Sequence, residues 1–291
     1  MKNGKIGFLV KITAAAVALV ASLTAFAACG QTGEKLAYGK EIVTLSTQLD
    51  TLTQLNAGSL DAAVIDSVMA GYYSSNGEYA GKVTVMDGVL KREQYGIAAR
   101  KSDEAFMSEI NKALLALAGN GGMEEVAKQF GLTSDIAVTG SETNPYEDAT
   151  DSSWEKIKQS GKIVIGYTVF APIAFDEGDG LTGYDIELAR AVVEWLNQTY
   201  SLDLELKFQI IDWNSKEVLL SNGTIDLIWN GLTIDEQRLA NMCISLPYLN
   251  NDQVVVIMKA DEDKYVTPED LADAVIGVEK GSAGESVVRG N

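Results

Sequence analysis

Stretches with the apolar pattern of β-strands alternate with stretches of helical periodicity along most of this sequence, and that alternation constrains the fold most strongly. Strand patterns occupy residues 41–46, 59–66, 162–167 and 253–259 among others, and helix patterns such as residues 182–198 separate them. One face of that last helix is apolar, through Ile186, Ala189, Val193 and Leu196. Such alternation is typical of α/β proteins, in which helices cover parallel sheets. We therefore predict an α/β fold with largely parallel sheets.

Residues 133–151 form a polar, patternless segment that we interpret as a linker between two runs of strands and helices. Helices are predicted to start on both sides of it: Ser102 would cap one, and Ser152 begins a stretch with the spacing of a capping box. The two runs share one short repeat, because residues 55–61 (LNAGSLD) match residues 220–226 (LSNGTID). Two similar α/β lobes would explain this repeat, and so would chance.

The chain is strongly acidic, with a formal net charge of −18. The only basic residues among the first 28 are Lys2, Lys5 and Lys11, and no acidic residue occurs there, so the remainder carries 20 basic and 41 acidic residues. Because nucleic-acid phosphates need a basic surface, this balance argues against a nucleic-acid partner. The apolar content of 46% is enough for the core of one large or two smaller domains.

Residues 1–28 have the three regions of a signal peptide: a basic start, a short apolar run and small residues before Cys29. The sequence FAACG resembles a bacterial lipoprotein processing site, although Phe26 stands where leucine is more usual. This resemblance implies that Cys29 is lipidated and that residues 29–40 tether the protein to the extracellular face of the cytoplasmic membrane. The alternative is ordinary signal cleavage near Ala27 and Ala28, with Cys29 left free.

Several kinds of catalytic site are excluded by what the sequence lacks. It contains no histidine, so no Ser-His-Asp triad, Cys-His pair or zinc site of cysteines and histidines can form. It has no GxxxxGK[ST] phosphate-binding loop, and Lys280, two residues before Ser282, breaks the G-x-S-x-G nucleophile pattern. Carboxylates remain as acid–base groups, but their spacing singles out no pair. We therefore expect no enzymatic activity, cofactor or metal.

Two sets of motifs carry a family resemblance. Residues 152–289 contain GKIVIGYTVFAPIAF, GLTGYDIELARAVVEWL, LLSNGTIDLIWNGLTIDEQR, SLPYLNNDQVVVIMK and DLADAVIGVEKGSAGES, and residues 41–132 contain TLTQLNAGSLDAAVIDSVMAGYY, EQYGIAARKSDEAFMSEINKALLAL and GGMEEVAKQFGL. The first set resembles the first half of bacterial extracellular solute-binding proteins for amino acids, and the second set is similar to the second half of the same family. The halves thus stand in exchanged order, which implies a circular permutation.

This resemblance implies a type II periplasmic binding protein-like fold, in which two hinge strands join two α/β lobes. One lobe would comprise residues 93–132 and 152–250, and the other would comprise residues 34–88 and 254–291. Residues 133–151 would join the usual C- and N-termini of the family, and the ends of the chain would mark a cut inside the second lobe. Alternatively, the chain is one link of a tandem array whose halves pair with neighbouring chains, as in domain swapping. We expect a monomer.

A free amino acid carries a carboxylate that needs a cation or hydrogen-bond donors when it is buried. The resemblance places Arg238 and Thr233 on the ligand carboxylate, and an arginine side chain can fork onto such a group. It adds the backbone N–H groups of Ser282 and Ala283 at the start of a helix, where anions bind well. The alternative for Arg238 is a solvated arginine on a helix.

The ligand ammonium group needs the opposite environment, an anion and hydrogen-bond acceptors. The resemblance places Asp66 on this group, with help from the carbonyl side of Asn230 and Gly231. Asp66 also follows a buried strand, where it would serve as the N-cap of the next helix. The two roles of Asp66 are compatible.

The side-chain pocket implied by the resemblance consists of Tyr167, Phe170, Trp213 and Trp229, because aromatic faces can clamp an aliphatic stem or a cation. The alternative is ordinary core packing, above all for Trp229 on a buried strand. Tyr167 stands where binders of cationic amino acids often carry an acid. This favours a neutral polar or aromatic L-amino acid over a cationic one.

The function implied by the resemblance is capture of a free L-amino acid by closure of two lobes, followed by recognition by an ABC-type permease in the membrane. Two other classes remain open: a ligand sensor that signals to a membrane partner, and a dehydratase of cyclic acids on the same fold. The paired Arg238 and Asp66 argue against the dehydratase.

Overall fold

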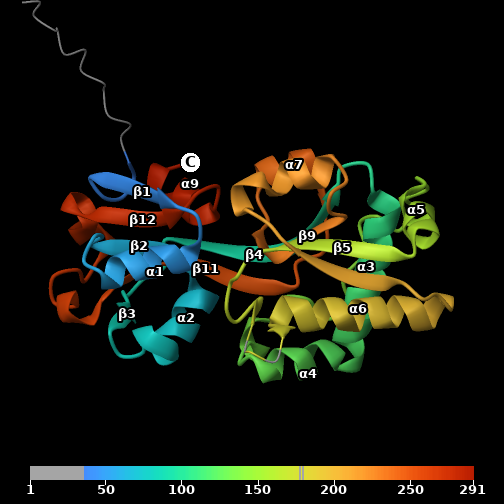
Figure 1. The fold of residues 1–291 in the computed structure, drawn as a ribbon, viewed down its shortest axis with the longest axis horizontal. Coiled ribbons are helices and arrows are strands. Elements are labelled where there is room, and N and C mark those ends of the chain that lie inside the picture. The colour runs from blue at the N-terminus through green and yellow to red at the C-terminus, as the bar shows by residue number, and fades with distance from the viewer. Residues whose placement is uncertain (1–35, 177, 179) are drawn as a thin grey trace, which may run out of the picture. The chain divides into compact units, whose positions relative to one another are not determined.

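A computed structural model describes residues 36–291 of the chain, apart from residues 177 and 179 (Figure 1). The described residues belong to one unit, Lys35–Asn291. The predicted signal peptide, the lipidation site Cys29 and residues 29–35 of the tether lie outside the described residues. Within the described part of the chain, no helix combines the length and the apolar character that crossing a membrane requires.

Ten strands of the described part form one mixed sheet (Figure 1). Its main path has the order β1-β12-β2-β11-β4-β9-β5-β8, with β3 beside β11 and β10 beside β4. The strands are β1 (Glu41–Leu45), β2 (Ala62–Asp66), β3 (Val83–Val85), β4 (Lys91–Arg100), β5 (Lys162–Tyr167), β8 (Glu205–Ile210), β9 (Leu227–Thr233), β10 (Met242–Ile244), β11 (Leu249–Met258) and β12 (Val275–Glu279). A separate small sheet consists of β6 (Phe175–Asp176) and β7 (Leu181–Thr182).

Two ten-residue strands, β4 and β11, connect the two ends of this sheet. They pair antiparallel with each other, from Leu249 opposite Tyr95 to Gln253 opposite Lys91. Beyond this shared ladder, β11 pairs with β2 and β3, whereas β4 pairs with β9 and β10. We call the part built on β4, β5, β8, β9 and β10 the first lobe, and the part built on β1, β2, β3 and β12 the second lobe. The predicted α/β class, with two lobes joined by two hinge strands, is therefore confirmed.

The prediction of largely parallel sheets is wrong for the middle of the molecule. The pairs β1/β12, β12/β2, β5/β8 and β5/β9 are parallel, but every pairing of β4 and β11 is antiparallel. Each lobe thus keeps a parallel group of strands, and the hinge strands run against their neighbours. An apolar strand pattern does not record the direction of the strand, so the sequence could not separate these cases.

Helices cover both lobes (Figure 1). The α-helices of the described part are α1 (Gln48–Asn56), α2 (Ser67–Ser75), α3 (Glu104–Asn120), α4 (Gly122–Gln129), α5 (Ser153–Ser160), α6 (Tyr184–Tyr200), α7 (Lys216–Ser221), α8 (Glu236–Asn241) and α9 (Ala283–Arg289). Short 3₁₀ helices span Gly77–Tyr79, Thr133–Asp135, Trp213–Ser215, Lys259–Asp261 and Pro268–Asp273. The last of these begins with a capping box formed by Thr267 and Asp270.

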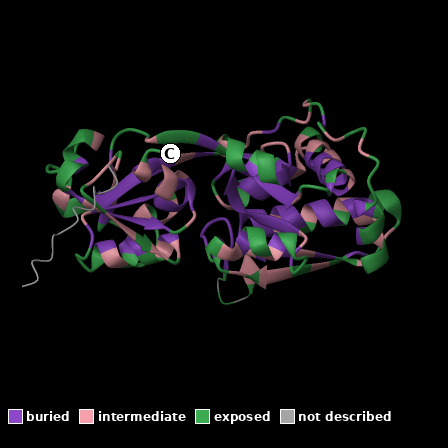
Figure 2. Cartoon of the chain, turned by 90° about the horizontal axis from the view of Figure 1, so that it is seen from above, coloured by how far each residue is buried: buried purple, intermediate pink, exposed green. Residues whose placement is uncertain are grey.

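Burial follows the predicted apolar patterns in the central strands and on the inner faces of the helices, whereas the edge strands β1 and β8 contain no buried residue (Figure 2). The face predicted for α6, made of Ile186, Ala189, Val193 and Leu196, is buried as expected. Every residue of β2 and of β9 is also buried. The amphipathic helices and the buried strands therefore form the core that the periodicity indicated.

Of the two predicted helix caps, the one at Ser102 is wrong, whereas Ser152 does occupy the N-cap position of α5 but forms no capping box. Helix α3 begins after Asp103 rather than Ser102, and neither Asp103 nor Ser152 makes a side-chain capping bond. Instead, the Ala105 amide donates to Asp151 Oδ2 at 2.7 Å, and the Phe106 amide donates to Ser153 Oγ at 2.9 Å. Residues far along the chain satisfy the free amides at the start of α3, which a local sequence signal cannot reveal.

Residues 133–151, predicted to be a patternless linker, pack onto the first lobe. Ile136 forms a bridge with Leu249 of β11. The buried Asn144 accepts a hydrogen bond from Asn111 Nδ2 at 3.1 Å and donates one to Ser108 Oγ at 2.9 Å. Polar groups this deeply buried are stabilising only when they are hydrogen-bonded. The segment is therefore an integrated part of the structure rather than a loose connection.

Candidate functional site

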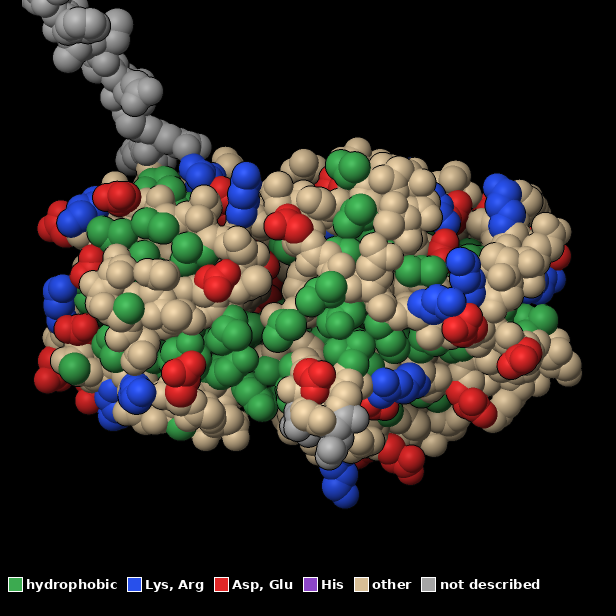
Figure 3. Space-filling view, in the orientation of Figure 1, with side chains coloured by type: hydrophobic (Ala, Val, Ile, Leu, Met, Phe, Trp, Pro, Cys, Tyr) green, Lys and Arg blue, Asp and Glu red, His purple; other side chains and the backbone are tan. Residues whose placement is uncertain are grey.

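A pocket lies where the two lobes meet, and both lobes contribute to its walls. It is lined by Gln48, Asp66, Met69, Thr168, Val169, Phe170, Trp213, Asn230, Gly231, Thr233, Arg238, Glu279, Ser282 and Ala283. Figure 3 shows apolar side chains gathered where the two lobes meet, with charged side chains around them. The free space inside is about 20 Å³, room for about one water molecule. A larger ligand can enter only if the walls move apart.

The topology explains why these residues converge. Asp66 and Glu279 end the parallel strands β2 and β12 of the second lobe. Thr168 follows β5 in the first lobe, and Trp213 follows β8, the parallel neighbour of β5. The carboxyl ends of parallel strands lie at the same edge of a sheet, which is where α/β proteins bind ligands. Each lobe therefore directs the carboxyl edge of its parallel strands at the pocket.

Arg238 supplies a positive charge to the first-lobe wall. The residue lies on α8 and is only 7% exposed, so it is not a solvated helix arginine. Its Nη1 donates to the Thr233 carbonyl oxygen at 2.6 Å, and its Nε lies 3.3 Å from Asp235 Oδ2. Its Nη2 lies 3.4 Å from the Gly281 carbonyl oxygen of the second lobe. The guanidinium group is thus held at the pocket and reaches across to the opposite wall.

Asp66 supplies a negative charge to the second-lobe wall. It stands at the N-cap position of α2, as the sequence suggested, but its side chain makes no capping bond. Instead, Oδ2 accepts from Gln48 Nε2 at 2.6 Å, and Oδ1 accepts from Asn251 Nδ2 at 2.9 Å and from Gln253 Nε2. Burial and the nearby carboxylate of Glu93 raise the pKa of Asp66. The carboxylate is therefore positioned by amides and is poised to accept a cationic partner.

Glu93, on the hinge strand β4, shares the amides that hold Asp66. Its Oε1 accepts from Asn251 Nδ2 at 2.8 Å and from Gln253 Nε2 at 2.7 Å. The Thr233 hydroxyl, predicted to bind the ligand carboxylate, also donates to this oxygen at 2.9 Å. Thr233 lines the pocket, but its hydroxyl hydrogen is used by Glu93 in this structure.

Glu279 is a second pocket carboxylate that the sequence reasoning missed. It is 5% exposed, and burial together with the charge of Asp66 raises the pKa of Glu279 to about 8. Its position at the carboxyl end of a buried strand, directly before the turn that carries Ser282, was the available signal. Gln48 was missed as well, because nothing local distinguishes it from other residues of a first helical turn.

Ser282 and Ala283 line the pocket at the start of α9. The Ser282 hydroxyl oxygen caps the helix by accepting from the Glu285 amide at 3.1 Å. The Ser282 amide donates to the Glu279 carbonyl oxygen at 3.2 Å within the preceding turn. Of the two predicted backbone donors, Ser282 N–H is therefore engaged inside the turn in this structure.

Asn230 and Gly231 also line the pocket, in the buried strand β9. Asn230 Nδ2 donates to Thr168 Oγ1 at 2.8 Å. The Gly231 backbone has φ of +62°, and a Cβ atom there would lie 2.6 Å from Phe170 Cε1. Only glycine fits this wall without displacing the aromatic ring.

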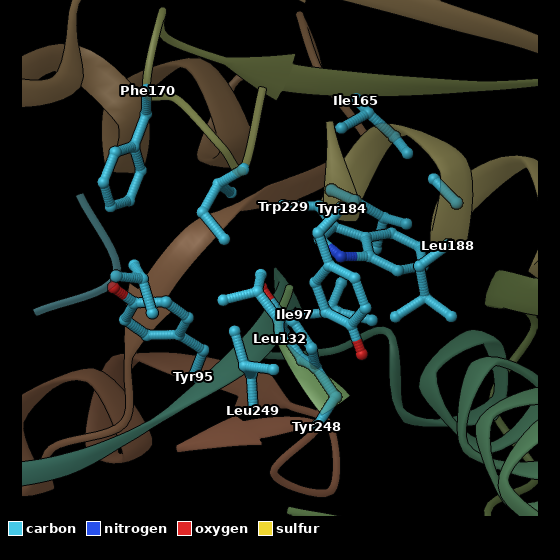
Figure 4. Packing of buried hydrophobic residues seen from close by; sticks show 14 of the residues in the cluster. Tyr95, Ile97, Leu132, Ile165, Phe170, Tyr184, Leu188, Trp229, Tyr248 and Leu249 are labelled. Carbon is cyan, nitrogen blue, oxygen red and sulfur yellow. The ribbon is translucent and has the colours of Figure 1, made fainter. Parts of the chain in front are cut away.

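The four predicted aromatic residues divide into two groups. Phe170 and Trp213 line the pocket, whereas Tyr167 and Trp229 do not. The ring of Trp229, 1% exposed, lies 6.3 Å from that of Tyr248 in the core (Figure 4). The ring of Tyr167 packs 6.3 Å from that of Phe208. Trp229 is thus a core residue, as the alternative interpretation held, since the whole of β9 is buried.

Nothing in the described part of the chain forms a cluster of three or more acidic or cysteine side chains able to hold a metal ion. The pocket instead combines buried carboxylates, a buried guanidinium group, amides and aromatic faces. Such a set can bind a small polar molecule that carries both charges.

One family model matches part of this chain. Residues 163–284 match the model of the family described as bacterial extracellular solute-binding proteins, family 3. The match runs from β5 into α9 and includes Arg238, Glu279 and Ser282 of the pocket. The family resemblance inferred from the sequence motifs is therefore confirmed for this part of the chain, which is less than half of its length.

Curated relatives match over limited lengths. The L-cystine-binding protein TcyJ of Escherichia coli (strain K12) is 25% identical over 164 residues, which are 56% of this chain and 59% of that protein. The arginine-binding extracellular protein ArtP of Bacillus subtilis (strain 168) is 27% identical over 43% of this chain and 46% of that protein. The chain thus spans less than two thirds of the length of these relatives. A membrane-bound lytic murein transglycosylase F of Photobacterium profundum is 32% identical over only 26% of that enzyme.

Solved structures give similar partial matches. A substrate-binding protein of an ABC uptake transporter from Streptococcus pneumoniae, solved with bound histidine, is 38% identical over 31% of this chain and 35% of that one, with a TM-score of 0.28. The arginine-bound form of domain 1 from TmArgBP is 27% identical over 40% of this chain and 90% of that one, with a TM-score of 0.29.

Proposed function

We propose that this protein is the extracellular amino-acid-binding component of an ABC importer and that it captures one free L-amino acid by closure of its two lobes. The observation that carries the proposal is the placement of Arg238 and Asp66. The two side chains are buried, have opposite charges, come from different lobes and line the same pocket. A zwitterionic ligand matches this arrangement, with its carboxylate on Arg238 and its ammonium group on Asp66.

Closure follows from the division of these groups between the lobes. A ligand that touches Arg238 on one side and Asp66 on the other stabilises the state in which the lobes are together. The narrow free space of the pocket agrees with such a closed state. The hinge strands β4 and β11 carry the motion in this proposal, and the closed form would be recognised by a membrane permease.

We further propose a neutral polar or aromatic amino acid as the ligand. Phe170 and Trp213 would contact its side chain through their aromatic faces. The relatives are named for cystine and arginine, and Glu279 adds an acid to the pocket that the sequence reasoning did not include. Cationic amino acids therefore belong in any test of specificity beside the neutral ones.

The exchanged order of the family motifs supports a circular permutation. In the structure, β1 pairs in parallel with β12, and the Ala37 amide donates to the Val288 carbonyl oxygen at 2.8 Å. The segments that the permutation would separate therefore lie together in one lobe. Lipidation of Cys29 would keep the protein at the extracellular face of the cytoplasmic membrane. A monomer is expected, and a tandem or domain-swapped array is the alternative.

The test is a thermal-shift screen against the common L-amino acids, on protein carrying Cys29→Ser and sized by light scattering. Ligand at about a thousand times Kd adds about 4 kcal/mol to the free energy of unfolding, which corresponds to several degrees at this size. A shift confined to a few amino acids, on a monomer, supports the proposal. Absence of any shift, also after refolding from denaturant to remove bound ligand, contradicts it.

Two alternatives make different predictions. A sensor would bind an amino acid equally well, but cells lacking the protein would still import that amino acid at the normal rate. A dehydratase would convert a prephenate-like cyclic acid, and turnover of such a substrate would identify it.

A further inference from the structure

Lys216, the first residue of α7, is a buried cation beside the pocket that no sequence argument singled out. It is 4% exposed. Its Nζ donates to the Trp213 carbonyl oxygen at 3.3 Å and to the Gly281 carbonyl oxygen at 3.2 Å. The same atom lies 4.6 Å from the centroid of the Trp213 ring, in a cation–π contact. Lys216 therefore joins the first-lobe wall to the turn of the second lobe.

The charge of Lys216 is poorly compensated. Among the described residues, no carboxylate lies within 4.0 Å of its Nζ, and the neighbouring charges are those of Arg238, Glu217, Glu279 and Asp235. Burial and the positive charge of Arg238 lower the pKa of Lys216 to about 8. A buried ammonium group without an ion-pair partner is costly, and an apolar side chain of similar size would pack there at lower cost. A contribution to folding stability therefore does not explain why a lysine occupies this buried position.

The contact of Lys216 with the Gly281 carbonyl oxygen indicates the role of this lysine. The Gly281 carbonyl oxygen also lies 3.4 Å from Arg238 Nη2, so two cations of the first lobe converge on one oxygen of the second lobe. Gly281 immediately precedes Ser282 and Ala283, the residues with predicted ligand-binding amides. The Gly281 amide is itself held by Glu285 Oε2 at 2.7 Å. The Gly281 carbonyl oxygen is thus the atom at which cations of the first lobe hold this turn, and Lys216 makes one of the two contacts there.

We propose that Lys216 is a positioning residue of the binding site, whose ammonium group ties the Gly281–Ser282 turn to Trp213 and so sets the second-lobe wall against the ligand. This proposal rests on the proposed binding function. Lys216 acts through the turn and through Trp213, and Arg238 remains the group that binds the ligand carboxylate.

The experiment compares Lys216→Met, Lys216→Arg and the control Lys280→Met. Lys280 is the exposed lysine next to Gly281, so its replacement removes the same charge near the same turn. Two quantities are measured for each: affinity for the amino acid that binds the unmodified protein, by titration calorimetry, and backbone hydrogen exchange of residues 281–285 in the absence of ligand. Thermal unfolding of the ligand-free protein is recorded as a check on folding.

Lys216→Met is expected to weaken binding by about tenfold to a hundredfold, the value of a hydrogen bond to a charged group. It should also speed exchange in residues 281–285 by about tenfold without lowering the thermal midpoint. Lys216→Arg keeps a charged donor and should retain most of the affinity, and Lys280→Met should match the unmodified protein. If Lys216 had only a structural role, Lys216→Met would instead lower the thermal midpoint and leave hydrogen exchange in residues 281–285 unchanged.

Unchanged affinity in Lys216→Met would overturn the proposal, whatever the exchange shows. If the unmodified protein binds no amino acid, the proposed function fails separately, and the exchange measurement decides on Lys216 alone. Unchanged exchange in the turn would then overturn its positioning role, whereas faster exchange would support it.

Discussion

The carboxylate of Asp185, at the start of α6, accepts a hydrogen bond of 2.8 Å from the Gly231 amide in the pocket wall. The same oxygen accepts from the Tyr248 hydroxyl group at 2.8 Å. Asp185 is 1% exposed, so this contact is made inside the core of the first lobe. It links the long helix α6 to the strand that carries Asn230 and Gly231, and it fixes the wall that predicted ligand-binding residues share.

We therefore predict that Asp185→Ala destabilises the protein by about 2–4 kcal/mol, because the Gly231 amide and the Tyr248 hydroxyl group lose their acceptor while still buried. Urea-induced unfolding, followed by fluorescence, measures the change. Asp203→Ala serves as the control, since Asp203 is exposed. Equal stability of the two variants would show that the contact with Gly231 contributes nothing.

Arg238→Ala should lower affinity for the amino acid at least about a hundredfold, because it leaves the ligand carboxylate buried without its cation. The protein should remain folded, since the pocket lies between the lobes rather than in either core. Calorimetric titration measures the affinity, and circular dichroism confirms the fold. Arg92→Ala, a change of an exposed arginine on the hinge strand β4, should bind normally. Binding by Arg238→Ala at the affinity of this control would exclude the assigned carboxylate site.

Ligand binding should release protons near neutral pH. Burial raises the pKa of Asp66 to about 7 and that of Glu279 to about 8, so near pH 7 these carboxylates are partly protonated in the ligand-free pocket. A ligand ammonium group stabilises the ionised form of Asp66 and displaces protons, on the order of one per site. Calorimetry at pH 7 in two buffers of different ionisation enthalpy counts them. Asp66→Asn should reduce both the proton count and the affinity. Identical heats in the two buffers would contradict the role of Asp66.

The stability of the ligand-free protein should fall as pH rises from about 5 to about 8. Burial raises the pKa of Asp185 to about 7 and that of Glu279 to about 8, whereas both groups titrate near about 4 in an unfolded chain. Between these values the folded state binds more protons than the unfolded state, so the free energy of unfolding decreases with pH. Carboxylates with lowered pKa values, such as Asp61 and Asp151, act in the opposite sense only near pH 4 and below.

Thermal midpoints at pH 5, 6.5 and 8 measure this dependence. In the Glu279→Gln variant the side chain at this position cannot ionise. Its thermal midpoint should therefore change less with pH than that of the unmodified protein. A midpoint that rises steadily from pH 5 to pH 8 would mean that the buried carboxylates are not destabilised in their charged form.

The sequence predicted individual elements well because their signals are local. The strand at residues 162–167 coincides with β5, and the apolar face of residues 182–198 is the buried face of α6. The cap predicted at Ser102 was wrong because Asp151 and Ser153, close in space rather than in sequence, bond to the amides of α3. Ser152 is the N-cap residue of α5, but the predicted capping box does not form.

For the site, the family resemblance named nine residues that do line one pocket, and these are Asp66, Phe170, Trp213, Asn230, Gly231, Thr233, Arg238, Ser282 and Ala283. It also named Tyr167 and Trp229, which pack elsewhere. The missed residues Gln48 and Glu279 of the pocket have no motif of their own. They belong to the pocket only because two lobes bring distant segments together.

The sequence by itself determined the α/β class, the buried faces of the main elements and the acidic character of the protein, since periodicity and composition act over a few residues at a time. Only the tertiary structure decided the antiparallel hinge of β4 and β11, the integration of residues 133–151 and the approach of Lys216 and Arg238 to Gly281. These features depend on contacts between segments far apart in the chain. The free energy that stabilises these features comes from burial and hydrogen bonding between distant segments, which a local sequence pattern does not show.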